Sequence, residues 1–360
     1  MQVAVLGSGN GGCAVAFDFA QHGHTVNVFD FEAFPANIAA LAAKGGLSSE
    51  GDLSGFASTA CAGHDIEQAL DGAELVLVVG PAYSTESFGE ACRPFLKKGQ
   101  VVVVCPGSSG GALAFKQSAG LQLQDDSVVV ADTGTLPYAV RILEPGRIHV
   151  YLKLRAAVAL AALPARHTAR VLGMLADVYP CLTPAANVLF TALANANPVI
   201  HPAVTIGSAA QIERTGGELL FYEEGITPSV GRLMEAVDRE RATIAAALGM
   251  RLLPDPEMCV RQGYMTEASY YPGYMLAPGF KGIKAQAGLD HRYFHEDVGY
   301  GLVFFRTLAL QLGVQTPAIA AVIEIASQMT GRDYFAEGRR TAASLGLAGH
   351  TAAELVELIA

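Results

Sequence analysis

The chain opens with a short apolar run followed by a glycine-rich turn, and these residues constrain the fold more than any other stretch. The run VAVLG at 3–7 is typical of a β-strand, and a helix is predicted directly after the turn. The turn has the spacing Gly-x-Gly-x-x-Gly and consists of Gly7, Ser8, Gly9, Asn10, Gly11 and Gly12. This pattern predicts a strand, turn and helix that bind the pyrophosphate of a dinucleotide at the helix N-terminus.

Each glycine in this turn has its own expected task. Gly7 permits the tight turn, Gly9 lets the backbone approach the pyrophosphate, and Gly12 lets the helix pack close to the strand. A Gly-x-Gly-x-x-Gly pattern alone is a weak signal. Here a second strand, TVNVFD at 25–30, completes the unit and strengthens the prediction.

Asp30 ends the second strand, near the position where dinucleotide-binding units carry an acidic residue. Its carboxylate can accept hydrogen bonds from the adenosine ribose, and its charge would repel a 2′-phosphate. We therefore expect NAD as the cofactor and NADP as less favoured. The alternative is that Asp30 only caps the following helix, as aspartate often does.

Further apolar strands follow at intervals along the first half of the chain, at 75–80, 101–107 and 127–133. Continuous apolar strands separated by helices indicate a parallel sheet covered on both faces, which is the doubly wound Rossmann arrangement. The segment 146–164 is expected to add strands at the far edge of this sheet, and 165–179 is expected to contain a helix.

Two of these strands break into proline or glycine at their carboxyl ends. Gly80 and Pro81 lie in VVGPAYST, and Pro106 lies in VVCPGSSGGALAF. Ligands of doubly wound sheets bind at this edge, so these residues are candidate cofactor contacts. Ordinary turn chemistry explains them equally well.

A chain of 360 residues exceeds what one hydrophobic core usually serves, so two domains are expected. From about residue 185 the pattern changes to longer helical stretches, such as 229–249 and 316–331, with few strand-like runs. We predict a dinucleotide-binding domain at 1–184 and a helical domain that carries the substrate site and catalytic residues at 185–360.

The composition argues against several classes of partner. The net charge of −10 disfavours nucleic-acid binding, since proteins that bind the phosphate backbone carry basic patches. The longest uncharged apolar stretches, such as LVLVVGPA, are far shorter than the ~18 residues that a membrane span needs. We expect no nucleic-acid partner and no membrane partner.

The cysteines and the N-terminus bear on the compartment. The six cysteines show no close pairing and no Cys-x-x-Cys motif, so we expect reduced thiols and no metal site. MQVAVLGSG enters a strand without a basic leader, which predicts a cytoplasmic protein.

His201 is the first candidate for chemistry. It lies in NANPVIHPAVT at 195–205, where the only other polar side chains before it are Asn195 and Asn197. A helical course would place Asn197 and His201, which are four residues apart, on one face. The alternative is a core histidine that bonds to a backbone carbonyl.

A second polar cluster, DHRYFHEDVGYG at 290–301, offers partners for this histidine. Asp297 could hold His201 in one tautomer, and Arg292 could bind a substrate carboxylate with a bidentate fork. Helix capping and a solvated face are the alternative explanation of the charges in this segment.

Seven segments together resemble the opine dehydrogenases, the octopine and nopaline dehydrogenase family. They are LGSGNGG, PGSSGGAL, TLPYAVR, NANPVIHP, EGITPSVG, DHRYFHEDV and GLVFF. The resemblance covers nearly the whole chain and is greatest to the bacterial N-(1-D-carboxyethyl)-L-norvaline dehydrogenase type. Only the first segment is generic, whereas those of the second half are specific.

The resemblance implies a Rossmann domain followed by an all-α domain of the 6-phosphogluconate dehydrogenase C-terminal type. It implies that an L-amino acid condenses with a 2-keto acid such as pyruvate, and that NADH reduces the imine. His201 then matches the catalytic histidine, Asp297 its partner, and Arg292 the arginine of that loop, with Asn197 beside them in the substrate site. A homodimer is also implied.

Two other functions remain open at this point. A ketopantoate reductase or a glycerol-3-phosphate dehydrogenase relative would share the domain plan but is expected to use a lysine as acid. No lysine occurs between Lys153 and Lys281, although Lys281 and Lys284 are available. A non-catalytic module that senses NAD would need the glycine-rich turn but not His201 and its partners.

Overall fold

The computed structural model describes all 360 residues, which divide into two compact units. The first comprises residues 1–192 together with 358–360, and the second comprises residues 193–357. The predicted domain boundary after residue 184 lies at the end of a short strand, shortly before this division, and stays a prediction.

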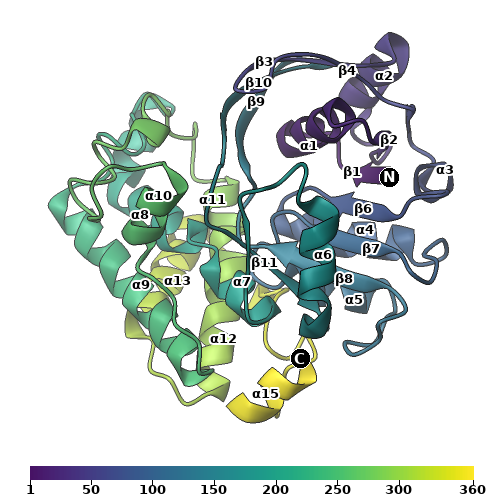
Figure 1. Cartoon of the computed structure of the whole chain (residues 1–360). Coiled ribbons are helices and arrows are strands. Elements are labelled where there is room, and N and C mark those ends of the chain that lie inside the picture. Colours follow the sequence, from purple (N-terminus) through teal and green to yellow (C-terminus); the bar gives the residue numbers. More distant parts are fainter. The chain divides into compact units, whose positions relative to one another are not determined.

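The first unit is built on an eight-stranded sheet (Figure 1). Its strands, in spatial order, are β12 (Leu182–Pro184), β11 (Val158–Leu163), β8 (Val129–Thr133), β7 (Val101–Val104), β6 (Leu75–Val78), β1 (Gln2–Leu6), β2 (Thr25–Phe29) and β5 (Cys61–Gly63). The six strands from β8 to β5 are all parallel. Their spatial order is that of a Rossmann sheet: from β1 the chain first adds β2 and β5 on one side and then β6, β7 and β8 on the other. This order confirms the predicted doubly wound domain.

The residues of the central strands explain why this sheet is buried. In β1, β6 and β7 every side chain except Gln2 is apolar and at most 2% exposed, as the pattern of continuous Val and Leu predicts. The helices of this unit are α1 (Asn10–Gln21), α2 (Pro35–Lys44), α3 (Ile66–Leu70), α4 (Thr85–Cys92), α5 (Gly111–Ser118) and α6 (Thr168–Leu175). The helix predicted within 165–179 is therefore present, as α6.

A second sheet of four strands was not predicted. Its spatial order is β4 (Gly55–Ser58), β3 (Gly46–Gly51), β10 (Arg147–Lys153) and β9 (Tyr138–Glu144), and Figure 1 shows it beside α1 and α2. Asp18 of α1 anchors it, because its carboxylate accepts from Tyr138 Oη at 2.5 Å and pairs with Lys153 Nζ at 2.6 Å.

The prediction that 146–164 extends the main sheet is therefore only half right. β11 does join it, antiparallel to β8, whereas β10 belongs to the second sheet. The physical difference is visible in the side chains: β11 is buried on both faces, while in β10 only Ile148 and Val150 are fully buried.

The second unit is helical, as predicted. Its main helices are α8 (Asn197–Thr215), α9 (Pro228–Ala247), α10 (Asp255–Gln262), α12 (Val303–Gln311) and α13 (Pro317–Thr330). Short elements complete it: a 3-10 turn at Pro278–Phe280, α11 (Arg292–His295), a π-helical segment at Asp297–Leu302, and α14 (Tyr334–Glu337). Helices α7 (Val188–Ala194) and α15 (Ala352–Leu358) lie where the two units meet in the sequence.

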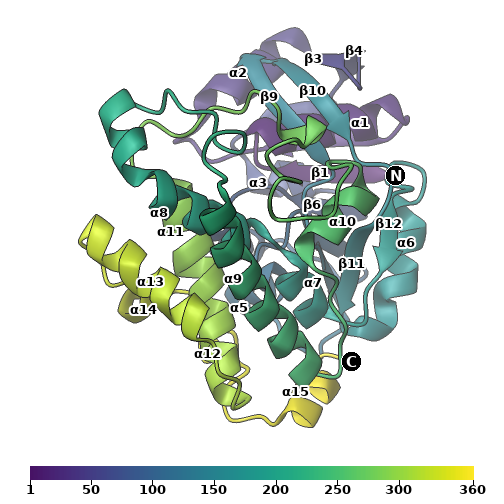
Figure 2. The ribbon, with the colours of Figure 1, turned by 90° about the vertical axis from the view of Figure 1, so that its left-hand side faces the viewer.

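Helices α8, α9, α12 and α13 pack against one another and form the centre of this unit (Figure 2). Their facing side chains include Val204, Met234, Phe304 and Val322, all with at most 1% of their surface exposed. No helix of the chain is both long enough and apolar enough to cross a lipid bilayer.

Candidate active site

His201 and Asp297 lie 96 positions apart in the sequence and are hydrogen-bonded to each other in the second unit. The distance from His201 Nδ1 to Asp297 Oδ2 is 2.7 Å, and the residues are 6% and 2% exposed. A carboxylate accepts hydrogen bonds, so Nδ1 carries the hydrogen, and in the neutral ring the lone pair is then on Nε2. The alternative of a histidine bonded to a backbone carbonyl does not describe His201.

The backbone on both sides of this pair is irregular helix. His201 lies one turn into α8, between the helix start at Asn197 and the internal Pro202, which has no N–H to donate. Asp297 begins the π-helical segment, where Gly301 N donates to Glu296 O, five residues back, at 3.1 Å. Such widened turns are frequent at functional sites.

Aromatic side chains enclose the imidazole, and the sequence analysis assigned them no role. Tyr293 stacks on His201 with ring centres 3.9 Å apart, and Phe221 lies edge-on at 5.9 Å. Tyr222 Oη lies 3.2 Å from His201 Nε2. Tyr293 belongs to the predicted polar cluster, but no pattern in the sequence distinguishes Tyr222 from a packing residue.

Arg292 begins α11, close in sequence to Asp297, and pairs with a buried carboxylate. Its Nε donates to Glu296 Oε2 at 2.8 Å, and its side chain is 45% exposed. Burial opposes the charge of Arg292, but Glu296 and Asp297 outweigh this effect and raise its pKa. Its two terminal nitrogens have no partner within the chain and remain free to bind an anion end-on.

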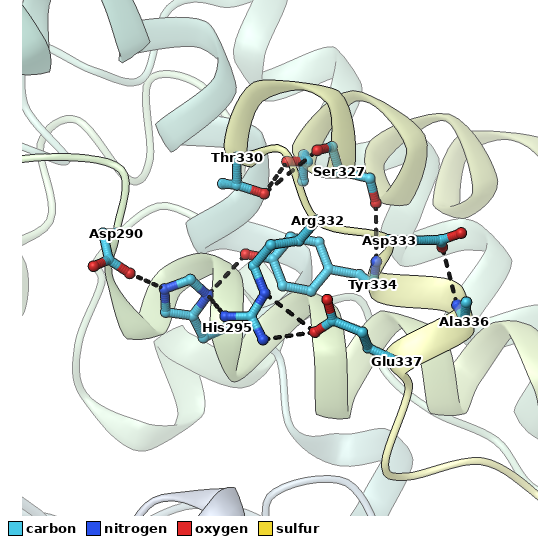
Figure 3. Close-up of polar contacts among 10 residues, drawn as sticks. Asp290, His295, Ser327, Thr330, Arg332, Asp333, Tyr334, Ala336 and Glu337 are labelled. Carbon is cyan, nitrogen blue, oxygen red and sulfur yellow. Dashed lines mark hydrogen bonds and ion pairs between the residues drawn. The ribbon is translucent and has the colours of Figure 1, made fainter.

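The segment that carries Arg292 and Asp297 is held by a polar cluster on its other side (Figure 3). His295 Nε2 lies 2.5 Å from Asp290, while Tyr334 Oη and Arg332 Nη1 are 2.8 Å and 3.3 Å from its Nδ1. A guanidinium only donates, so Nδ1 is the acceptor and Nε2 carries the hydrogen. The cluster links the segment to the turn between α13 and α14.

Asn197 is placed as the sequence predicted, one helical turn before His201 on α8. Its backbone N–H is bound by the Asn195 side chain at 3.2 Å, and its own amide group makes no hydrogen bond within the chain. Burial of His291, followed by the nearby charges of Arg292 and His201, lowers the pKa of its imidazole.

The glycine-rich turn in the first unit has the geometry that its sequence requires. Gly7 has a φ of +110°, and a Cβ on Gly12 would lie 1.8 Å from Gly7 O, so neither position tolerates a side chain. A Cβ on Gly9, by contrast, would meet nothing within 4 Å. Close packing at Gly12 and open space at Gly9 match the tasks expected of a dinucleotide-binding turn.

Asp30 is buried under this turn and does not cap the next helix, which begins at Pro35 with Phe34 as its N-cap. Its Oδ2 accepts from Ser8 N at 2.6 Å and Ser8 Oγ at 2.7 Å, and its Oδ1 accepts from Phe31 N at 2.8 Å. A carboxylate offers about four acceptor sites, so capacity for a ribose hydroxyl remains.

The other predicted cofactor residues also surround the carboxyl edge of the main sheet. Gly80 and Pro81 follow β6, and Pro106 follows β7, the strands that succeed β1 in the sheet. A Cβ on Gly80 would lie 2.2 Å from Ser84 Oγ. Asn10 accepts from Ile142 N at 2.7 Å, which fastens the start of α1 to β9.

A hollow of about 520 Å³ lies elsewhere on the second unit. Among its lining residues are Pro228, Arg232, Glu235, Glu257, Tyr270 and Tyr271. None of the four residues predicted for chemistry lines it, so it is not the candidate active site.

Comparisons with known proteins agree with both units. Residues 184–330 match the family model described as "NAD/NADP octopine/nopaline dehydrogenase, alpha-helical domain". Residues 2–118 match the model described as "NAD-dependent glycerol-3-phosphate dehydrogenase N-terminus".

Among full-length relatives, the chain is 35% identical to an opine dehydrogenase of Arthrobacter sp. (strain 1C), over 97% of this chain and 96% of that protein. It is 27% identical to the protein ocs of Agrobacterium tumefaciens (strain Ach5), over 99% of each chain. Its fold is similar to a solved octopine dehydrogenase in complex with NADH and agmatine, with a TM-score of 0.79, 21% identity, and coverage of 97% and 99% of the two chains.

Proposed function

The chain belongs to the opine dehydrogenase family, and on this premise we propose that it condenses an L-amino acid with a 2-keto acid such as pyruvate. The imine is reduced with NADH to an N-(carboxyalkyl)amino acid, and the reverse oxidation uses NAD. The protein is thus a dehydrogenase, and we assign it to those that act on CH–NH groups. The observation that carries the proposal is the buried hydrogen bond between His201 and Asp297 in the helical unit.

The glycine-rich turn fits a dinucleotide. Gly9 leaves open space for a phosphate beside the N-terminus of α1, and Gly7 and Gly12 allow the close packing beneath it. Asp30 adds a buried negative charge at the end of β2, which supports NAD over NADP. When bound, the nicotinamide supplies or accepts the hydride. Ser8, Asn10, Gly11, Gly80, Pro81 and Pro106 are the further residues proposed to contact it.

We assign His201 as the acid and base of the reaction. In the oxidative direction, neutral His201 accepts the proton that the secondary amine loses as the imine forms. Asp297 fixes the ring with hydrogen on Nδ1 and stabilises the imidazolium that results. In synthesis the proton moves in the opposite direction.

We assign Arg292 to the substrate carboxylate. Because Glu296 occupies its Nε, a carboxylate would bind the two terminal nitrogens in an end-on fork. Asn197, whose amide has no partner in the chain, is proposed to bind the substrate beside it. A reductase of the ketopantoate or glycerol-3-phosphate type would need a lysine as its acid. Lys284 does not support this alternative, because it pairs with Glu218 on the surface at 2.7 Å.

The deciding experiment follows NADH absorbance with pyruvate and a panel of L-amino acids. Oxidation of NADH that requires both organic substrates is expected. Turnover with a keto acid alone would indicate a ketopantoate or glycerol-3-phosphate type of reductase, and NADH binding without turnover would indicate a sensing module. Light scattering in the same buffer tests the proposed homodimer.

His201→Asn tests the assignment of the base. We expect this variant to bind NADH normally and to lose at least about a hundredfold in kcat, because general acid–base groups contribute 10²–10⁴-fold. NADH fluorescence titration provides the binding control. Near-normal turnover in a folded His201→Asn variant would remove His201 from the mechanism.

A further inference from the structure

Nε2 of His201, the nitrogen that must exchange the proton, is occupied by another side chain. Tyr222 Oη lies 3.2 Å from it, and both residues are 6% exposed. Because Asp297 holds the hydrogen on Nδ1, Nε2 of the neutral ring has only a lone pair, and the phenol donates into it. A substrate proton can reach this lone pair only if the phenol moves away or passes the proton on.

The ring of Tyr222 is held in place by other aromatic rings. Phe280 is nearly parallel to it, with centres 4.4 Å apart and planes inclined by 14°. Phe221 meets it edge-on at 5.1 Å, and Tyr274 lies parallel to it at 6.5 Å. Withdrawing the phenol from His201 would break these contacts, so the geometry favours transfer through the hydroxyl over its displacement.

The phenol has the properties that a relay needs. Burial, followed by the nearby Tyr293, raises the pKa of Tyr222 well above its ordinary value, so the hydroxyl keeps its proton at neutral pH. Oη makes no hydrogen bond within the chain other than that to His201, and its lone pairs are therefore available to an incoming N–H or O–H donor.

We propose that Tyr222 is a catalytic residue that relays the proton between the substrate and His201, an inference that rests on the proposed function. In the oxidative direction, the N–H bond of the secondary amine breaks and its proton binds Tyr222 Oη. The original O–H bond of Tyr222 breaks at the same time, and that proton binds His201 Nε2. The hydride leaves the adjacent carbon for NAD, so the imine forms, Tyr222 is restored and His201 becomes imidazolium beside Asp297.

Tyr222→Phe removes the hydroxyl and keeps the ring, and Tyr274→Phe is its matched control. Tyr274 belongs to the same stack, but its Oη lies near Cys259 Sγ, at 3.7 Å, and does not contact His201. We expect Tyr222→Phe to lose at least about tenfold in kcat for opine oxidation, toward the range of a lost acid–base group. The KM for NAD should be unchanged in Tyr222→Phe. The kcat of Tyr274→Phe should stay within about threefold of that of the wild type, which is the size of effect expected from one weak neutral hydrogen bond.

The proton inventory of kcat in mixtures of H₂O and D₂O gives a second readout. Two protons in flight produce a curved dependence on deuterium content in the wild type, whereas a direct transfer produces a straight line. If the phenol only competes with substrate for the lone pair, Tyr222→Phe will be as fast as the wild type or faster. The relay would be overturned by any loss in kcat below tenfold in Tyr222→Phe. It would also be overturned by a linear proton inventory in the wild type, or by an equal loss of kcat in Tyr274→Phe.

Three controls separate failure of the relay from failure of the proposed function. If the wild type lacks amino-acid-dependent turnover, or if His201→Asn keeps it, the proposed function itself fails. If both behave as expected and Tyr222→Phe loses less than about tenfold in kcat, only the relay fails. The double variant Tyr222→Phe/His201→Asn should be no slower than His201→Asn, because groups in one relay are not additive.

Discussion

At the scale of single residues, the histidine in an apolar helix is explained by what binds its two nitrogens. Asp297 accepts from Nδ1 and Tyr222 donates to Nε2, so no polar atom of the buried ring lacks a partner. Tyr293 and Phe221 cover the ring itself. These contacts fix both the orientation and the tautomer, which a base needs before substrate arrives.

Asp30 gives a testable prediction at the scale of single residues. Its carboxylate supports the glycine-rich turn through Ser8 and would repel a 2′-phosphate. We expect Asp30→Ser to reduce the preference for NADH over NADPH by at least about tenfold, since a repulsive charge and a ribose acceptor are both lost. The kcat/KM ratio of the two coenzymes measures this preference. An unchanged ratio in a folded variant would assign Asp30 a structural task only.

At the scale of elements, the first β-strand, its turn and α1 form a unit whose glycines act differently. Gly12 is needed for folding, because a Cβ there would overlap Gly7 O, whereas Gly9 faces open space. The two positions therefore separate the packing of α1 from the binding of phosphate.

Gly9→Ala is expected to fold normally and to weaken NADH binding by at least about tenfold, since the new methyl group fills the space that a phosphate needs. Gly173→Ala in α6 is the matched control, because its Cβ would also meet nothing within 4 Å. Thermal melting shows that each variant folds, and fluorescence titration gives its NADH affinity. Equal affinity in the two variants would contradict the proposed phosphate site.

The π-helical segment is the second element that matters for the site. Its wider turn begins at Asp297, the residue that reaches His201, and continues directly into α12. On its other side the cluster of His295, Tyr334 and Arg332 anchors the preceding segment (Figure 3). Asp297 is therefore held between α12 on one side and the anchored segment that precedes it on the other, which suits a residue that must orient the imidazole of His201.

At the scale of the whole molecule, one buried carboxyl group makes stability depend on pH. Asp255, beside the ion pair of Asp238 and Arg241, is 5% exposed. Burial raises its pKa from its ordinary value of 3.8 to about 7, although Arg241 opposes the shift. Between these values the folded protein keeps a proton that the unfolded chain releases, so the stabilisation is complete at low pH and is lost as the pH rises toward 7.

Asp255→Asn should remove this dependence. In the wild type, the group lowers the free energy of unfolding by up to about 1.4 kcal/mol for each pH unit in that window. We expect the variant to lose this slope between pH 4 and pH 7, as measured by urea unfolding at several pH values. Asp71→Asn, which changes a carboxylate that is 78% exposed, is the control and should leave the slope intact. Equal slopes for wild type and Asp255→Asn would contradict the prediction.

Much of the fold follows from local patterns in the sequence. The continuous apolar strands and the turn at Gly7 to Gly12 predict the Rossmann sheet, because burial on both faces and close packing at glycine are local requirements. The helical periodicity after residue 185 predicts α9 and α13 in the same way. The pair His201 and Asp297 was predicted from the two polar clusters that carry these residues, and the motifs that the chain shares with the opine dehydrogenases support the same pair.

Other features depend on contacts between distant residues, which no local pattern encodes. The second sheet arises because β10 finds a partner in β3, about a hundred residues away, and Asp18 anchors it with Lys153. Tyr222 looks like any packing aromatic until the chain brings its hydroxyl to His201. Local sequence thus determined the elements and the dinucleotide turn, whereas only the tertiary structure decided which polar groups meet, because hydrogen bonds between distant segments form after those segments have packed.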